Sequence, residues 1–349
     1  MIIIDAHTHI RNIDGNYAPL YDMARRLNYS RLTVLSLQSD GDLLQNLTCI
    51  QCKASHPGMT YAFGGLDYVS GRGFAAQAEN LRAMGFDGVK MLEGKPTTRK
   101  KLGLALDDPS YDAFFTYLED TGFPVLMHVA DPRTFWDSEK VPSWAVEHGW
   151  FYDGSHVPYE RYYEEVERLL CKHPRLKAIF AHFFFLSSEP ARLQRFLDSH
   201  PMVSVDVTAG IEMYEDFSKD PAFWREFFIK NRDRILFGTD SDDMTQNPDP
   251  AGDGGQDPVS INGYAGMEID FLKNDADMGI YGMKLHGLGL PQPALERIFS
   301  QNYLKYVDDS PCPLHMDAIQ REASLIHALL KDEEDIKKLD IILGRLNTL

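Results

Sequence analysis

Two histidines near the start of the chain have the spacing of a metal-binding pair. Residues 2–10, IIIDAHTHI, form an apolar run that ends in His7 and His9 with only Thr8 between them. In a β-strand, side chains two residues apart point to the same side. Both imidazoles can therefore reach one metal ion. A single pair of this kind arises easily by chance, so it needs support from the rest of the sequence.

That support comes from ionisable residues at the ends of other apolar segments. They are Lys90 in GVKM, His128 in VLMHVAD, His182 in AIFAHFF and Asp240 in LFGTDS. If the segments are parallel strands of a barrel, their C-terminal ends form the face where barrel enzymes build their sites. Histidines with a carboxylate are typical ligands of a catalytic ion that keeps one position open for water. The pattern therefore predicts a catalytic metal centre.

The elements that would position these residues are short apolar strands separated by helical segments. We predict eight strands, at residues 1–5, 32–37, 60–66, 86–91, 123–129, 176–182, 202–208 and 234–240. Helical periodicity fills the gaps, for example at 74–85, 109–122, 159–174 and 189–201. Strands of this kind alternating with helices indicate parallel βαβ units, and eight such units predict an α/β protein with a (β/α)8 TIM barrel. An open doubly wound sheet would want a glycine-rich phosphate loop after its first strand, and HTHIRNIDG is not one.

The predicted barrel is distorted by insertions and lengthened by an extension. Residues 241–263 are rich in Gly, Pro and Asp and predict a loop, and residues 309–349 predict helices appended to the barrel. No clean linker is found, so we expect one domain over 1–349. Residues 130–158 form a long insertion that brings several large side chains to the barrel mouth: Arg133, Phe135, Trp136, Trp144, Trp150 and Phe151.

Composition argues against several classes of function. The formal net charge of −17 argues against a nucleic-acid partner, which calls for a basic surface. No apolar stretch approaches the roughly 20 residues of a membrane span, and the start of the chain does not resemble a signal peptide. We expect a cytoplasmic protein that binds neither nucleic acid nor membrane and acts on a small molecule. The four cysteines are too few for a disulfide scaffold, and we interpret Cys49 and Cys52 as partly buried thiols rather than a zinc or redox pair.

On these motifs the sequence resembles the amidohydrolase superfamily of metal-dependent barrel hydrolases. The shared pattern is HxH on strand 1, a histidine on each of strands 5 and 6, and an aspartate on strand 8. Within the superfamily the chain resembles the amidohydrolase-2 branch, which contains aminocarboxymuconate semialdehyde decarboxylase. The stretches HVADPRTFW and GIYGMKLHGLGLP add to the resemblance, which covers roughly residues 1–307.

The resemblance implies four metal ligands: His7, His9, His128 and Asp240. It implies that His182 lies beside the water at the metal. Lys90 corresponds to a lysine that is carbamylated and bridges two ions in binuclear members, but not in the mononuclear branch. Because the rest of the chain resembles the mononuclear branch, we expect one divalent ion, Zn²⁺ first, with Mn²⁺, Fe²⁺ or Ni²⁺ as alternatives. Homodimers are common in that branch, so by analogy we expect a homodimer.

Such a site predicts hydrolysis of a small amide, lactone or ester by a metal-activated water. Asp240 would accept the water proton, and His182 would hydrogen-bond the water or polarise the carbonyl. Arg133 would pair with a substrate carboxylate, or else with a local aspartate, and Trp136 would belong to an aromatic lid over the substrate. The basic run 95–101 either draws an anionic substrate or is a solvated loop.

Three alternatives remain open from the sequence. The first is a metal-dependent, non-oxidative decarboxylase of a small unsaturated or aromatic carboxylic acid, which would use the same ligands. The second is a lactonase that works without a metal ion. The third is a non-catalytic barrel used for binding or as a scaffold.

Overall fold

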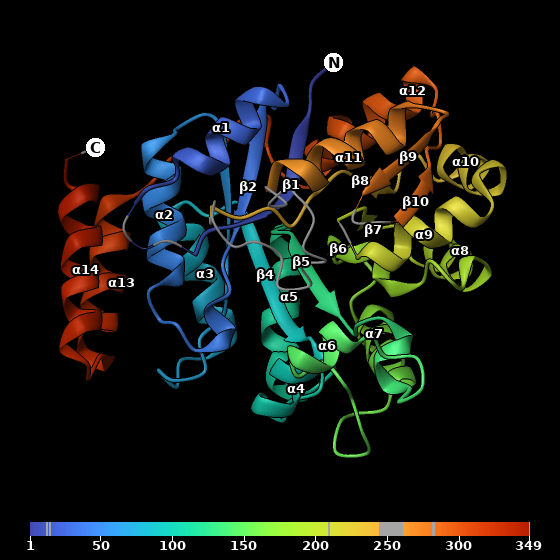
Figure 1. Ribbon diagram of the computed structural model, residues 1–349. Helices are drawn as coiled ribbons and strands as arrows, with labels where there is room; N and C mark the ends of the chain where they lie inside the picture. The colour runs from blue at the N-terminus through green and yellow to red at the C-terminus, as the bar shows by residue number, and fades with distance from the viewer. Residues whose placement is uncertain (12, 14, 209, 244–260, 281–282, 349) are drawn as a thin grey trace.

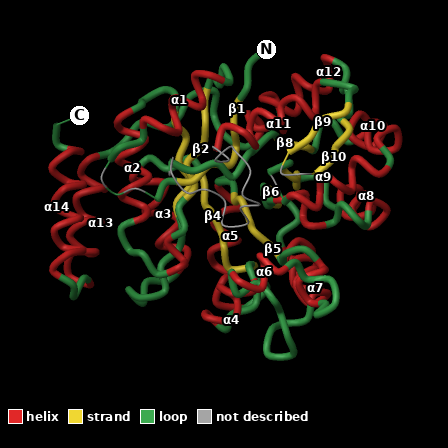
Figure 2. The backbone as a smooth tube through the Cα atoms, viewed as in Figure 1, coloured by secondary structure: helices red, strands yellow, loops and turns green. Residues whose placement is uncertain are grey.

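A computed structural model describes residues 1–11, 13, 15–208, 210–243, 261–280 and 283–348. In these residues eight parallel strands form one sheet in chain order, with helices outside it (Figures 1 and 2). The strands are β1 (Ile4–His9), β2 (Arg31–Leu35), β3 (Thr60–Gly64), β4 (Gly88–Gly94), β5 (Val125–Val129), β6 (Ala178–Phe180), β7 (Val203–Asp206) and β8 (Ile235–Leu236).

Backbone hydrogen bonds between β1 and the segment around β8 bring the sheet almost to closure. Ala6 N–H donates to the Phe237 carbonyl over 3.0 Å, and Asp240 N–H donates to the His7 carbonyl over 2.8 Å. His9 N–H donates in turn to the Ser241 carbonyl over 2.8 Å. The predicted eight-stranded TIM barrel is confirmed. Its distortion is visible in β8, which is only two residues long.

Helices between the strands cover the outside of the barrel (Figure 2). They are α1 (Ala18–Arg26), α2 (Gln45–Ser55), α3 (Phe74–Met84), α4 (Pro96–Leu102), α5 (Asp112–Thr121), α7 (Tyr159–Lys172), α8 (Pro190–Ser199), α9 (Ile211–Lys219), α10 (Pro221–Lys230), α11 (Ile261–Lys273) and α12 (Gln292–Glu296). The main apolar core lies between strands and helices, where alternate strand residues such as Val34, Val89 and Val205 point outward. A smaller cluster fills the barrel interior, with Ile4, Leu126, Ile179, Leu236 and Tyr303.

The long insertion after β5 folds into a small core of its own. It contains a single turn at Arg133–Trp136 and helix α6 (Ser143–Glu147). Phe135, Ala145 and Tyr152 are buried together, with Trp136, Trp144 and Trp150 packed against them. The aromatic residues of the predicted lid therefore pack largely on one another. Of the loop predicted at 241–263, residues 244–260 lie outside the described residues, and α11 begins at Ile261. An antiparallel hairpin of β9 (Asp277–Ile280) and β10 (Met283–His286) was not predicted.

The predicted C-terminal helices are present as α13 (Met316–Leu329) and α14 (Glu333–Leu346), beside α3 and α2 at one edge of the molecule (Figure 1). Arg72 holds Glu322 of α13 with two hydrogen bonds of 2.6 and 2.7 Å. Gly85 has φ +100°, and a Cβ there would lie 2.2 Å from the Pro313 carbonyl oxygen. The segment before α13 thus passes close against the C-terminal end of α3, at a position that only glycine suits.

Two further predictions from the sequence concern membrane-spanning helices and the thiols of Cys49 and Cys52. Among the described residues, every helix is too short or too polar to cross a membrane. Cys49 and Cys52 lie on α2 as free thiols, and both are fully buried. Burial raises the pKa of both thiols, which makes them poor nucleophiles.

A buried carboxyl group behind the barrel wall gives a testable pH dependence. Glu93 of β4 accepts a hydrogen bond of 2.7 Å from the Tyr68 hydroxyl, and burial raises its pKa to about 7. Between pH 4.5 and 7 the folded state therefore binds more protons than the unfolded state, so stability falls as the pH rises through this window. The shift corresponds to about 3 kcal/mol. We expect Glu93→Gln to remove this loss, measured by urea unfolding at pH 5 and pH 8.

The control is the exposed Glu79→Gln on α3, which should follow the wild-type pH dependence. A Glu93→Gln protein whose stability falls between pH 5 and 8 as much as that of the Glu79→Gln protein would contradict the assignment.

Candidate metal centre

A β-bulge turns both histidines of β1 into the barrel. Asp5 pairs with Leu32 and Thr8 with Val34, so β1 has one extra residue between these pairs. Ala6 packs in the barrel interior, and simple alternation would then turn His7 away. With the extra residue, the rings of His7 and His9 both lie inside the mouth, with centroids 5.2 Å apart.

Asp240 meets these histidines from the segment after β8. Its Oδ1 lies 2.9 Å from His9 Nε2 and 3.5 Å from His7 Nε2. One ligand atom each from His7, His182 and Asp240 all lie within 4.8 Å of one another. Ligands held 2.0–2.2 Å from one ion lie about 3 to 3.5 Å apart, so the separations from Asp240 fit shared coordination. The Asp240 side chain is 40% exposed, whereas His7 is 1% exposed, so the cluster opens to solvent on the Asp240 side.

Each of the four strand-end histidines has one ring nitrogen bonded to a protein acceptor. These bonds join His7 Nδ1 to Asp206 (2.9 Å), His9 Nδ1 to the Leu35 carbonyl (3.0 Å), His182 Nδ1 to the Thr208 carbonyl (3.3 Å) and His128 Nε2 to Asp131 (2.9 Å). A nitrogen that donates to such an acceptor carries the proton. The opposite nitrogen of the ring is then the one that can bind a metal, as in metal sites whose histidines are held by an outer hydrogen bond.

The protonation states of the cluster also suit a divalent ion. Burial lowers the pKa of His7 and of His128, and burial beside His128 lowers the pKa of His182 to about 4. These imidazoles are therefore neutral at pH 7. Burial alone would raise the pKa of Asp240, but the neighbouring His9 and His7 hold it well below its ordinary value. Neutral imidazoles beside an ionised carboxylate are the donor set that zinc-like ions take.

His128 lies at the side of the cluster, with its ring 4.9 Å from that of His182. It is not among the three residues with the closest donor atoms. Its ring is held by Asp131, which also accepts a hydrogen bond from the Tyr152 hydroxyl. Trp136 packs on Tyr152 with ring centroids 4.6 Å apart. Asp131 and Tyr152 of the insertion thus fix the orientation of the His128 ring, and Trp136 packs on Tyr152.

Lys90 lies deeper than the sequence suggested. It is the third of seven residues in β4, so the expectation that it ends its strand is wrong. Its ammonium donates to His7 Nε2 over 3.3 Å, and the side chain is fully buried. Burial lowers the pKa of Lys90 to about 8. It therefore stands below the mouth, against the inner side of His7.

His182 begins a turn of left-handed backbone. Residues 182 to 185 all have φ between 50° and 58°, a region that costs about 1–2 kcal/mol per residue without glycine. Asp206 Oδ1 accepts the His182 N–H over 2.8 Å, and the Tyr163 hydroxyl donates to the Phe184 carbonyl over 3.2 Å. Strained backbone held in this way is typical of functional sites.

Sequence reasoning missed the carboxylates that orient these rings. Asp206 receives His7 Nδ1 with one oxygen and the His182 amide with the other. A signal was available in VSVDVT, where Ser204, Asp206 and Thr208 alternate with valines and so share the barrel interior. Asp131, three residues after His128, had no such pattern.

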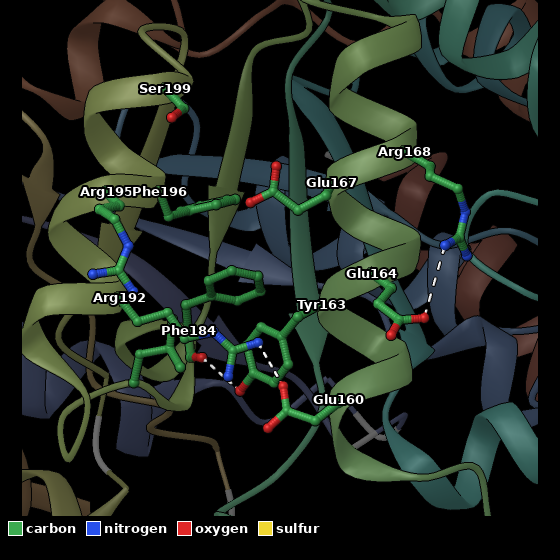
Figure 3. Close-up of a pocket in the computed structure, with 11 residues that line it drawn as sticks. Glu160, Tyr163, Glu164, Glu167, Arg168, Phe184, Arg192, Arg195, Phe196 and Ser199 are labelled. Carbon is green, nitrogen blue, oxygen red and sulfur yellow. Dashed lines mark hydrogen bonds and ion pairs between the residues drawn. The ribbon is translucent and has the colours of Figure 1, made fainter.

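Arg133 is not brought to the cluster. Its side chain is 59% exposed, and its guanidinium lies 3.1 Å from Glu189 and 3.6 Å from Glu160. Beside it, a hollow of about 400 Å³ opens between α7 and α8, where Arg192 lies on the Tyr163 ring and pairs with Glu160 (Figure 3). None of the residues that line this hollow is one of the strand-end histidines. It is therefore separate from the candidate metal centre.

Comparison with known proteins places the chain in a family. The model of the family described as "Amidohydrolase" matches residues 4–302, a span that contains every residue of the cluster. No curated protein matches the sequence.

Several solved structures share the fold. A probable 2-pyrone-4,6-dicarboxylic acid hydrolase from Acinetobacter baumannii is 14% identical with a TM-score of 0.52, over 88% of this chain and 99% of that chain. A 2,6-dihydroxybenzoate decarboxylase from Rhizobium is 13% identical with a TM-score of 0.54, over 87% and 97%. The IDCase of Metarhizium anisopliae is 15% identical with a TM-score of 0.53, over 87% and 96%.

At such low identities these likenesses show the fold alone, and the family match carries the assignment. Membership of an enzyme family does not fit the non-catalytic barrel considered from the sequence. The chain belongs to the amidohydrolase family, whose members are metal-dependent enzymes.

Proposed function

We propose that this enzyme hydrolyses a small amide, lactone or ester with one divalent metal ion. The proposed ligands are His7, His9, His128 and Asp240, and Zn²⁺ is the proposed ion, with Mn²⁺, Fe²⁺ or Ni²⁺ as alternatives. The observation that carries this proposal is the set of four outer hydrogen bonds, each of which leaves the opposite ring nitrogen for a ligand.

A divalent ion held there supplies Lewis acidity and activates water at neutral pH. Asp240 is the proposed base, because its carboxylate is ionised and reaches solvent. It takes the proton from the attacking water and returns it to the leaving nitrogen or oxygen. His182 donates through Nδ1 to Thr208, so its Nε2 is an acceptor. With this tautomer, His182 Nε2 can accept a hydrogen bond from the water and orient it, but it cannot donate one to the substrate carbonyl.

One ion is proposed rather than two because of the surroundings of Lys90. The amine is buried against His7 Nε2, so carbamylation would place a new negative charge in the barrel interior. We therefore do not assign Lys90 to bridging a second ion.

Decarboxylation is the second candidate, because a protein of similar fold from Rhizobium is a named 2,6-dihydroxybenzoate decarboxylase. The same residues would then serve differently. Asp240 would first take a proton from water and then give it to the substrate carbon, whose bond to the carboxylate breaks to release carbon dioxide.

The test is a product assay on the metal-loaded enzyme. The panel contains amides, lactones, esters, and aromatic and enoic carboxylates. We expect acid release with at least one carbonyl substrate, loss of that activity on chelation, and no change in the surface variant Asp233→Asn. Carbon dioxide as the only product would replace hydrolysis with the second candidate. A metal-loaded enzyme that turns over neither class would contradict both.

A further inference from the structure

Left-handed backbone is concentrated at the mouth of this barrel. Among the described residues, seven residues other than glycine have a positive φ, and six of them follow β5, β6 or β8. The six are Ala130, His182, Phe183, Phe184, Phe185 and Asp240. Backbone of this kind persists only where the surroundings fix it, and it collects at functional sites. The longest run is the turn at residues 182–185, where glycine would relieve the strain and three phenylalanines stand instead.

Two of the three phenylalanines of this turn pack in the core, and Phe185 does not. The Phe183 ring stacks on that of Phe228 with centroids 5.5 Å apart, and the Phe184 ring lies 4.5 Å from that of Phe180. Phe185 belongs to none of the three apolar clusters formed by the described residues, and it is only partly buried. Core packing therefore does not account for an aromatic side chain at this strained position.

The Phe185 ring lies instead on two imidazoles of the candidate metal centre. It stacks on the His182 ring, with centroids 5.0 Å apart and planes inclined by 26°, and it is tilted against the His128 ring at 5.4 Å. His128 is held independently by its 2.9 Å bond to Asp131. His182 has the longest of the four outer hydrogen bonds, 3.3 Å from Nδ1 to the Thr208 carbonyl. The Phe185 ring is thus a second contact that fixes the plane of His182.

Two tyrosines of α7 hold the turn from outside the barrel. Tyr159 and Tyr163 are four residues apart and so lie on one face of the helix. The Tyr159 hydroxyl donates to the Phe185 carbonyl over 3.3 Å. The Tyr163 hydroxyl lies 2.8 Å from that of Tyr159 and 3.2 Å from the Phe184 carbonyl oxygen. These contacts keep the backbone of Phe185 in the conformation that presents its ring to His182.

We propose that Phe185 is a positioning residue that fixes the orientation of the His182 ring. This inference rests on the proposed function, in which His182 Nε2 accepts a hydrogen bond from the attacking water. With the Phe185 ring in place, Nδ1 stays directed at the Thr208 carbonyl, and Nε2 keeps its lone pair for the water. Without that ring, the imidazole can rotate about its Cβ–Cγ bond and exchange between its two neutral tautomers.

Nitrogen NMR of metal-free protein labelled with ¹⁵N-histidine tests the inference without a substrate. The ring signals that are absent from His182→Gln are those of His182. In the wild type at pH 8, we expect one tautomer of His182, protonated on Nδ1. Phe185→Gly and Phe185→Ala should both show averaging of the two tautomers. Phe185→Tyr, which keeps the ring, should show one.

The glycine and alanine variants separate the ring from the strain. Both lose the ring, but only glycine removes the cost of the positive φ, so the urea midpoint of Phe185→Gly should be no lower than that of Phe185→Ala. On a substrate found in the product assay, both should lower kcat by at least about 10-fold and change KM less than about 2-fold, because a misdirected group costs rate rather than binding. Phe185→Tyr should recover most of kcat. Phe223→Ala, which removes a 45% exposed ring on α10, should match the wild type.

Three results would overturn the positioning role. They are mixed tautomers of His182 in the wild type, His182 signals that are the same in Phe185→Gly as in the wild type, and loss of bound metal in Phe185→Gly, which would move the role to the ligand His128. One tautomer in the wild type and two in Phe185→Gly, in a protein that binds no metal, would refute the proposed function while supporting the positioning role. Bound metal and hydrolysis with no effect of Phe185→Gly on His182 would do the reverse.

Discussion

Asp240→Asn is expected to lower kcat by about 10² to 10⁴-fold, the usual contribution of a positioned general base. Asparagine keeps the size of the side chain but cannot take a proton from water. It also loses the charge in the 2.9 Å contact with His9 Nε2. Steady-state kinetics at saturating metal measures the effect, and KM should change much less than kcat because the substrate still binds. Asp233→Asn, an exposed carboxylate paired with Arg297, is the control.

Metal content must be measured on the same Asp240→Asn protein. Retained metal with a large loss of kcat assigns Asp240 to proton transfer. An unchanged kcat in a fully loaded variant would contradict its role as base, whatever the reaction proves to be.

Asp206→Asn is expected to weaken metal binding by about 10 to 100-fold, the range found when outer partners of ligating histidines are changed. In the wild type the His182 N–H donates to Asp206 Oδ1 over 2.8 Å. The side-chain oxygen of the asparagine can still accept this hydrogen bond. In the wild type His7 Nδ1 donates to Asp206 Oδ2 over 2.9 Å. In the variant the NH₂ group of the asparagine would face this nitrogen. That ring would have to move its proton to Nε2 and so lose the lone pair that binds the ion.

Competition with a chelator of known affinity measures this change, and urea unfolding of the metal-free protein separates it from a loss of fold. Asp206→Ala, which removes both acceptors, should also release the left-handed turn at His182 and lower stability. If Asp206→Asn holds metal as tightly as the wild type, Asp206 does not set the state of His7.

Sequence reasoning predicted the barrel because its signal is local and repeated. Apolar runs such as LTVLSL and FPVLMHV are buried on both faces, and their alternation with helices leaves few other architectures. It also singled out the residues of the cluster, because a histidine or aspartate in such a run is unusual. The position of a residue along its strand was harder to predict, as Lys90 shows. Its place within β4 depends on where the strand ends, and the strand runs to Gly94.

The parts that were not predicted depend on contacts between distant segments. The bulge in β1 and the left-handed backbone from His182 have no residue preference that marks them, since four bulky or aromatic residues disfavour that backbone. Asp206 is recognised only when β7 lies opposite His7. Trp150 and Lys95 meet because the insertion folds back over the end of β4, which no pattern of periodicity encodes.

The metal content of the purified protein tests the central claim most directly. Elemental analysis after incubation with divalent ions and removal of the excess should find one equivalent in the wild type and in His327→Ala, which changes an exposed histidine on α13. His9→Ala should retain less than a tenth of that amount. Equal metal in His9→Ala and the wild type, or none in the wild type, would contradict a metal centre built by the strand-end histidines.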